Sequence, residues 1–216
     1  MRIDRRAQAA RTVAALRTLY PDAVCELDFS NPLELTVAVI LSAQCTDKRV
    51  NMVTPALFKR YRTAADYAGA DPAEIESLIR STGFFRSKAK SIREMAAALV
   101  REHGGKVPDT MAALLTLRGV ARKTANVILG TAYGKSEGIV VDTHMKRVAY
   151  RLGLTRRTDP VRVERDLMAC VAREDWDFFG IAMVWHGRRL CGALKPKCSE
   201  CPMAAFCPRR GVKASG

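Results

Sequence analysis

The chain has 216 residues, of which 48% are hydrophobic, so the sequence predicts a globular protein with one large core or two modest ones. The absence of an apolar run of membrane-spanning length and of a signal peptide argues against membrane-spanning and secreted proteins, and we expect a cytoplasmic protein. The 36 lysines and arginines outnumber 22 aspartates and glutamates, and the formal net charge of +14 favours a polyanionic partner such as nucleic acid.

Helical patterns follow one another along the chain. No strand-like alternation is long enough to build a sheet, so we expect an all-α fold. Val13, Leu16 and Leu19 recur at helical spacing and favour a folded first helix over an organelle presequence, which is the minor alternative. Further helix starts are predicted where an N-cap residue precedes proline, at Asn31-Pro32, Asp71-Pro72 and Asp159-Pro160. Glu34 and Glu74 are predicted to complete capping boxes at the first two.

The middle of the chain predicts two helices joined by a tight hairpin. After a helix that ends at Gly104, another starts near Asp109, breaks at Gly119 and is followed by a helix from Arg122 to Gly134. A glycine turn directly before a helix exposes backbone N–H groups at the positive end of the helix dipole, which favours a phosphate site. The pattern alone is only moderately specific, because many helix pairs meet at a glycine without binding an anion.

Two charged residues near this hairpin are candidate catalysts. Lys123 lies in the first turn of the second helix, where the dipole and Arg122 disfavour the ammonium form and so favour an amine nucleophile. The alternative is a solvated surface lysine. Asp142 follows the apolar residues 139–141 and opens a helix, as an N-cap does. A carboxylate there could also accept a proton from Lys123 or stabilise positive charge on a sugar ring.

Four of the seven cysteines crowd the C-terminal part of the chain. Cys191, Cys198, Cys201 and Cys207 are separated by six, two and five residues, which indicates a metal centre. Spacing alone leaves an iron–sulfur cluster, zinc and Cu(I) open. The others are predicted to be core thiols, since intracellular thiols stay reduced and these have apolar or helical neighbours: Cys25, Cys45 and Cys170.

Five segments, taken together and in this order, resemble the helix-hairpin-helix DNA glycosylases, and within them the endonuclease III family. They cover nearly the whole chain: Leu41–Asp47, Ser81–Ala89, Leu117–Ala125, Val141–His144 and the four C-terminal cysteines. The resemblance implies a bifunctional DNA glycosylase and abasic-site lyase that excises oxidised pyrimidines in base excision repair. Lys123 would attack the anomeric carbon and form a Schiff base whose β-elimination cuts the strand, and Asp142 would assist.

The resemblance also implies how the chain holds DNA. Gln44 would enter the space left by a flipped base, and Phe84 would occupy the position of a wedge residue that is usually leucine. Asp47 and His144 would line the site. A phosphate would be held by the hairpin residues, which are Arg118, Gly119, Val120, Ala121 and Arg122. The four cysteines would bind a [4Fe-4S] cluster that braces a cation-rich loop.

The domain organisation implied by the resemblance is two helical lobes with a DNA-binding cleft between them. Residues 28–134 would form a barrel-like helical domain that ends in the helix-hairpin-helix motif. Residues 1–27 and 135–216 would form a discontinuous helical domain that carries the cluster loop, 191–207. The expected partner is double-stranded DNA with damaged bases or abasic sites, bound by a monomer on the bacterial nucleoid, with no membrane involved.

Two alternative functions are open beside the bifunctional glycosylase and lyase. A monofunctional mismatch or adenine glycosylase would use water instead of Lys123, and a non-catalytic iron–sulfur paralogue would only bind DNA.

The family's usual Leu-Pro-Gly-Val-Gly run reads Leu-Arg-Gly-Val-Ala at 117–121 in this chain. We therefore expect Ala121 either to hold strained left-handed backbone, at about 1 kcal/mol, or to shift the hairpin. Arg118 would place an additional cation near the same phosphate.

Overall fold

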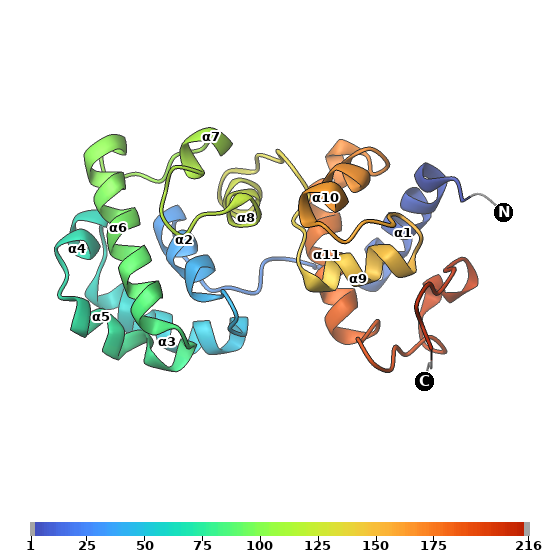
Figure 1. Cartoon of the computed structure of the whole chain (residues 1–216), viewed down its shortest axis with the longest axis horizontal. Helices are drawn as coiled ribbons and strands as arrows, with labels where there is room; N and C mark the ends of the chain where they lie inside the picture. Colours follow the sequence, from blue (N-terminus) through green and yellow to red (C-terminus); the bar gives the residue numbers. More distant parts are fainter. Residues whose placement is uncertain (1–2, 214–216) are drawn as a thin grey trace. The chain divides into compact units, whose positions relative to one another are not determined.

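The computed structural model describes residues 3–213 and contains only α-helices, short 3-10 helices and connecting segments in that part of the chain (Figure 1). The all-α prediction is therefore confirmed. None of the described helices is both long and apolar enough to cross a membrane. The chain divides into two compact units, each with its own core, and the division falls between Glu137 and Gly138 and between Cys25 and Glu26.

The first unit, Glu26–Glu137, is built around a buried helix. Helix α2 is apolar along most of its length, and every residue from Leu35 to Leu41 is buried. It contacts α3, α6 and α8, while α6 packs on α4 and α5. The helices of this unit are α2 (Pro32–Leu41), α3 (Asp47–Arg60), α4 (Ala64–Gly69), α5 (Pro72–Ile79), η1 (Arg80–Thr82), α6 (Phe85–His103), α7 (Met111–Leu114) and α8 (Arg122–Tyr133).

The second unit joins the described residues up to Cys25 to those from Gly138 onward. Helix α11 packs against α9 and α1, so the N-terminal helix shares a core with the C-terminal helices. Leu16, Met145 and Phe179 are fully buried in that core, and each contributes about 1.5–3 kcal/mol by leaving water. The helices are α1 (Arg5–Leu19), α9 (Thr143–Arg151), α10 (Pro160–Met168), η2 (Arg173–Asp175), α11 (Trp176–Arg189) and η3 (Pro202–Ala205).

We propose that these two units are the two domains expected from the sequence, with the cluster loop in the second. The barrel-like character of the first domain and the DNA-binding cleft stay predictions.

The N-caps predicted at the helix starts are confirmed, whereas the predicted capping boxes are not. All three Asn or Asp residues before proline are N-caps, with side chains that accept backbone N–H groups: Asn31, Asp71 and Asp159. The two predicted capping boxes are wrong. Glu34 Oε2 instead accepts the N–H of Ser30 at 2.7 Å, and Glu74 Oε1 pairs with Arg60 Nε at 2.6 Å. In each case another donor occupies the carboxylate that the capping box would have used.

Candidate active site and cysteine pocket

The predicted hairpin is present, but its backbone differs from the expectation. Helix α7 is a single turn, and the chain then turns at Gly119, whose φ is +81°, before α8 begins. Ala121 has φ −90° and ψ 172°, which is extended backbone that any residue adopts. Of the two alternatives expected for Ala121, strained left-handed backbone is therefore wrong, because the left-handed residue of this turn is Gly119. A shifted hairpin stays a prediction. Val120 is buried, and its N–H donates to the carbonyl of Leu117 at 3.1 Å.

This geometry predicts which turn residue is sensitive to substitution. A Cβ at Gly119 would lie 3.2 Å from Ser91 Cβ, in a backbone conformation that side chains disfavour. Gly119→Ala is expected to lower the free energy of unfolding by about 1–2 kcal/mol, measured by urea denaturation. The matched control Ala121→Gly is expected to change it by less than about 0.5 kcal/mol, since glycine is a tolerated N-cap. Equal losses in the two variants would contradict this assignment of the turn.

Lys123 lies at the start of α8, where its side chain is exposed. Ala121 is the N-cap of this helix and supplies no side-chain hydrogen bond to the first turn. The helix therefore begins without a side-chain cap, which favours an anion there. Arg118 Nη1 lies 3.3 Å from Glu94 Oε2, with both side chains about half exposed. Exposed ion pairs contribute little, so a DNA phosphate can compete with Glu94 for this cation.

Asp142 is the N-cap of α9, so the N-cap interpretation is confirmed. Its Oδ1 accepts the N–H of Met145 at 2.7 Å, and the residue is half-buried behind the buried Ile139 and Val141. The cap fixes the carboxylate at the beginning of the helix, and it uses one of two oxygens. The arrangement is therefore compatible with a second role for the other oxygen.

Two candidate DNA-contacting residues, Gln44 and Phe84, have left-handed backbone. Gln44 has φ +54° and Phe84 has φ +48°. Both residues are exposed, and the exposed fraction of Phe84, 65%, is large for an aromatic residue. Left-handed backbone costs about 1–2 kcal/mol in a residue other than glycine, and such strain is often found at functional sites. Both residues belong to the first unit, as do Lys123 and the hairpin.

His144 and Asp47 lie at helix starts in different units. His144 is half-buried on α9, with Nδ1 3.2 Å from Arg147 Nη2. A Cβ on Gly187 of α11 would come within 2.8 Å of His144 Cβ, so this crossing requires glycine. Asp47 is the first residue of α3, directly after the N-cap Thr46. Of the sequence-predicted residues, Asp47 thus belongs to the same unit as Lys123, and His144 to the same unit as Asp142.

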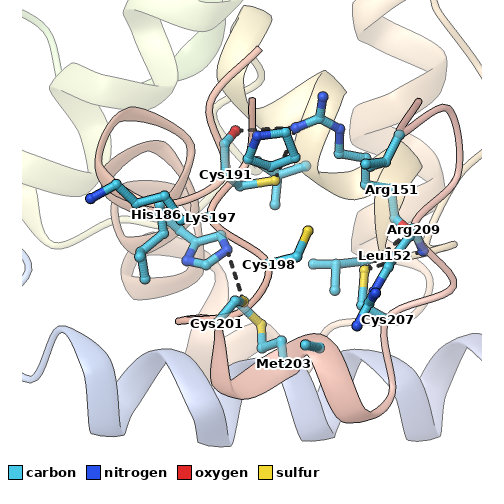
Figure 2. Close-up of a pocket in the computed structure, with 15 residues that line it drawn as sticks. Arg151, Leu152, His186, Cys191, Lys197, Cys198, Cys201, Met203, Cys207 and Arg209 are labelled. Atoms are coloured by element: carbon cyan, nitrogen blue, oxygen red, sulfur yellow. Dashed lines mark hydrogen bonds between the residues drawn. The ribbon is translucent and has the colours of Figure 1, made fainter. Parts of the chain in front are cut away.

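The four C-terminal cysteines line one pocket in the second unit, and Figure 2 shows them arranged around it. All four cysteines are half-buried. Nitrogen atoms approach three of the sulfurs. Arg151 Nη1 lies 3.2 Å from Cys191 Sγ, and His186 Nε2 lies 3.8 Å from Cys201 Sγ. The backbone N–H of Arg209 donates to Cys207 Sγ at 3.4 Å.

The donor set of this pocket fits a group that needs several thiolates. Burial raises the pKa of the Cys201 and Cys207 thiols, and N–H donors close to sulfur stabilise thiolates that bind metal. Within residues 3–213, no three His, Cys, Asp or Glu side chains are gathered closely enough to hold one metal ion. Four cysteine sulfurs around one pocket are a donor set that both iron–sulfur clusters and zinc take.

The remaining cysteines do not line this pocket. Each is half-buried, so none is a fully buried core thiol: Cys25, Cys45 and Cys170. Cys170 does pack against the hydrophobic core of the second unit, so for this residue the prediction is confirmed in part. Cys170, for example, follows the C-cap of α10 and donates to the carbonyl of Leu167 at 3.4 Å. Apolar neighbours in sequence did not bury any of these three side chains fully.

Two buried cations have roles that the sequence analysis missed. Arg151 is 6% exposed and donates to the carbonyls of Gly192 and Ala193 at 2.6 and 2.8 Å, bracing the loop after Cys191. Lys88 is 5% exposed and donates to two backbone carbonyls. A signal for Lys88 was available, because it lies on the apolar stripe of α6, formed by Ala89, Ile92, Met95, Ala96 and Leu99.

Comparisons with known proteins agree on the family. Residues 37–173 match the model of the HhH-GPD superfamily of base excision DNA repair proteins. Endonuclease III of Synechocystis is 54% identical over 205 residues, covering 95% of this chain and 94% of the relative. The solved structure of a trapped endonuclease III–DNA covalent intermediate, an estranged-adenine complex, is 41% identical over 97% of both chains, with a TM-score of 0.91.

The same fold also occurs in a glycosylase of much lower sequence identity to this chain. A thermostable thymine-DNA glycosylase has a similar fold, with a TM-score of 0.82, 22% identity, and coverage of 93% of this chain and 95% of that one. A likeness at that identity supports the fold alone, so activity has to be argued from the site. The matches over nearly the whole length at 54% and 41% identity are what decide the family. This chain belongs to the endonuclease III family of the HhH-GPD superfamily of base excision DNA repair proteins.

Proposed function

We propose that this protein is a bifunctional DNA glycosylase and abasic-site lyase of base excision repair, and that it acts on oxidised pyrimidines in duplex DNA. One observation carries the proposal. An exposed lysine, Lys123, stands at the uncapped start of α8, in a chain 41% identical over 97% of its length to an endonuclease III that was trapped covalently on DNA. A monofunctional glycosylase needs no amine at this position, because water displaces the base.

In the proposed reaction, the Lys123 amine attacks the anomeric carbon of the damaged nucleotide. The glycosidic bond breaks, and its electron pair leaves with the base. One of the two protons on the attacking nitrogen passes to the ring oxygen as the sugar ring opens, and the other stays on nitrogen in the protonated imine that forms between Nζ and the anomeric carbon. Loss of a proton from the adjacent carbon then expels the 3′ phosphate and cuts the strand. Asp142 is assigned the proton from Lys123 and the stabilisation of positive charge on the sugar.

The proposed DNA contacts are of two kinds. Some residues hold the phosphate backbone, and others enter the duplex. The hairpin Arg118–Arg122 and the uncapped start of α8 are assigned to phosphate, which positions the protein without reading sequence. Gln44 and Phe84 are assigned to the duplex interior, where they replace stacking lost when the target base flips. Their exposure and left-handed backbone support this assignment. Asp47 and His144 are proposed to line the site.

The cysteine pocket is proposed to hold a [4Fe-4S] cluster bound by Cys191, Cys198, Cys201 and Cys207. Bound there, the cluster would serve as a structural cross-link between the α11 end and the C-terminal loop. Arg151 braces the same loop through three consecutive residues, Cys191 to Ala193. The loop then presents cations to the phosphate backbone, chiefly Lys195, Lys197 and Arg209, which are exposed.

Replacing Asp142 with Asn tests the role of its charge. Asparagine is as good an N-cap as aspartate, so α9 is expected to keep its start and the melting temperature to change by less than about 3 °C. Single-turnover excision of an oxidised pyrimidine is expected to fall by about a hundredfold or more, because the carboxylate charge is removed. Full activity with an unchanged melting temperature would instead show that Asp142 is only a cap.

A further inference from the structure

We propose that Lys88 is a positioning residue that ties the Gln44 loop to the Phe84 loop and thereby sets the geometry with which both side chains open the base pair. The Gln44 loop is Ser42–Thr46, between α2 and α3, and the Phe84 loop is Gly83–Phe84, between η1 and α6. This inference rests on the proposed function, because it assigns Lys88 to the base-opening step of that reaction.

A single ammonium group connects the roots of both loops. Lys88 Nζ donates to the carbonyl of Leu41 at 2.7 Å and to the carbonyl of Thr82 at 2.8 Å. Leu41 ends α2 three residues before Gln44, and Thr82 ends η1 two residues before Phe84. The exposed fractions of Leu41, Thr82 and Lys88 are 0%, 2% and 5%, so water does not compete for these hydrogen bonds.

The chemistry of the contact explains why a lysine is used in the interior. Carbonyls at the end of a helix have no partner within the helix and lie at the negative end of its dipole, so a cation satisfies and stabilises them. Burial is the main influence on the Lys88 amine and lowers its pKa, whereas the nearby Cys45 acts in the opposite direction. An apolar side chain of similar length would fill the same space but leave both carbonyls unsatisfied.

The backbone of both loops indicates why this tie matters to function. Gln44 and Phe84 each hold left-handed backbone, and such residues keep that conformation only where their surroundings impose it. Fixed loop roots reduce the ordering that remains when the two side chains enter the duplex. The hydrogen-bond partners of Lys88 Nζ are the two loop roots, Leu41 and Thr82, and neither is assigned a part in the chemistry at Lys123. Loss of Lys88 is therefore expected to slow base opening more than the later chemistry.

Two substrates separate these steps. One duplex contains an oxidised pyrimidine, whose base must be flipped and excised, and the other contains a preformed abasic site, which has no base to extrude. In Lys88→Met, the single-turnover rate is expected to fall about tenfold on the first duplex and less than about threefold on the second. Lys59→Met is the matched control, since Lys59 is exposed on α3, and both of its rates are expected to match those of the wild-type protein.

A double-mutant cycle tests whether Lys88 acts through the loops. In a Gln44→Ala, Phe84→Ala background, adding Lys88→Met is expected to change the excision rate by less than about twofold, because the side chains it positions are gone. Lys88→Arg, which keeps a cation, is expected to recover at least half of the wild-type rate on the lesion and serves if Lys88→Met does not fold.

Three outcomes contradict the inference while leaving the proposed function intact. They are equal losses on the two substrates, an undiminished Lys88→Met effect in the Gln44→Ala, Phe84→Ala background, and a Lys88→Arg variant as slow as Lys88→Met. Wild-type protein that cleaves neither substrate would instead contradict the proposed function.

Discussion

Replacing Lys123 with Gln is expected to lower strand cleavage of a duplex containing an oxidised pyrimidine by at least about a thousandfold. The amide has no basic lone pair on nitrogen, so it can form no imine, and borohydride should trap no covalent complex. Affinity for the same duplex is expected to change by less than about threefold, because Lys123 is one exposed cation in a chain of net charge +14. Gel assays of cleavage and trapping, with a binding titration, measure all three quantities.

Lys59→Gln is the control for the charge that Lys123→Gln removes. Lys59 is also exposed, lies in the same unit and is assigned no part in the reaction. Cleavage and trapping by Lys59→Gln should equal those of the wild-type protein. Undiminished cleavage by Lys123→Gln would show that another group is the nucleophile. Base release without trapping by the wild-type protein would favour the monofunctional alternative.

Replacing Cys201 with Ser is expected to remove most of the iron from protein purified without oxygen, from about four atoms per chain in the wild type. Cys201 precedes η3, whose Met203 is fully buried in the core of the second unit. Loss of the cluster should therefore release the C-terminal loop from that core and weaken DNA binding by about tenfold, since the loop's cations lose their fixed place. Iron analysis, visible absorbance and a binding titration report these effects.

Cys25→Ser is the matched control for this substitution. Cys25 is half-buried like Cys201 but does not line the cysteine pocket, so its replacement should leave iron content and DNA affinity unchanged. A colourless wild-type protein with one zinc per chain would overturn the [4Fe-4S] assignment in favour of the zinc alternative. Equal loss of iron from both cysteine variants would show that the pocket does not define the ligand set.

Features that depend on neighbours in sequence were predicted well. The caps at Asn31, Asp71 and Asp159 were predictable because an N-cap side chain and the following proline act within one turn of helix. The capping boxes failed because the carboxylates of Glu34 and Glu74 found other donors, one of them on a different helix. Competition of that kind depends on the tertiary structure.

In the candidate site too, features set by residues close in sequence were predictable, and features set by tertiary packing were not. The hairpin and the order of the motifs were recognisable from the residues, yet Ala121 proved to be extended, since the turn takes its left-handed residue at Gly119. The role of Lys88 required two carbonyls from separate segments, which no local pattern displays. Its place on an apolar helix face marked it as unusual, but only the packing of α6 on α2 identified what it binds.

The most direct test of the account is to locate the covalent bond. Wild-type protein is incubated with the lesion duplex and borohydride, and the nucleotide-bearing peptide is identified by mass spectrometry after protease and nuclease digestion. The account predicts a reduced sugar remnant on Nζ of Lys123 and on no other amine. A remnant on a different lysine or on the N-terminal amine, or damaged base released with no remnant at all, would contradict it.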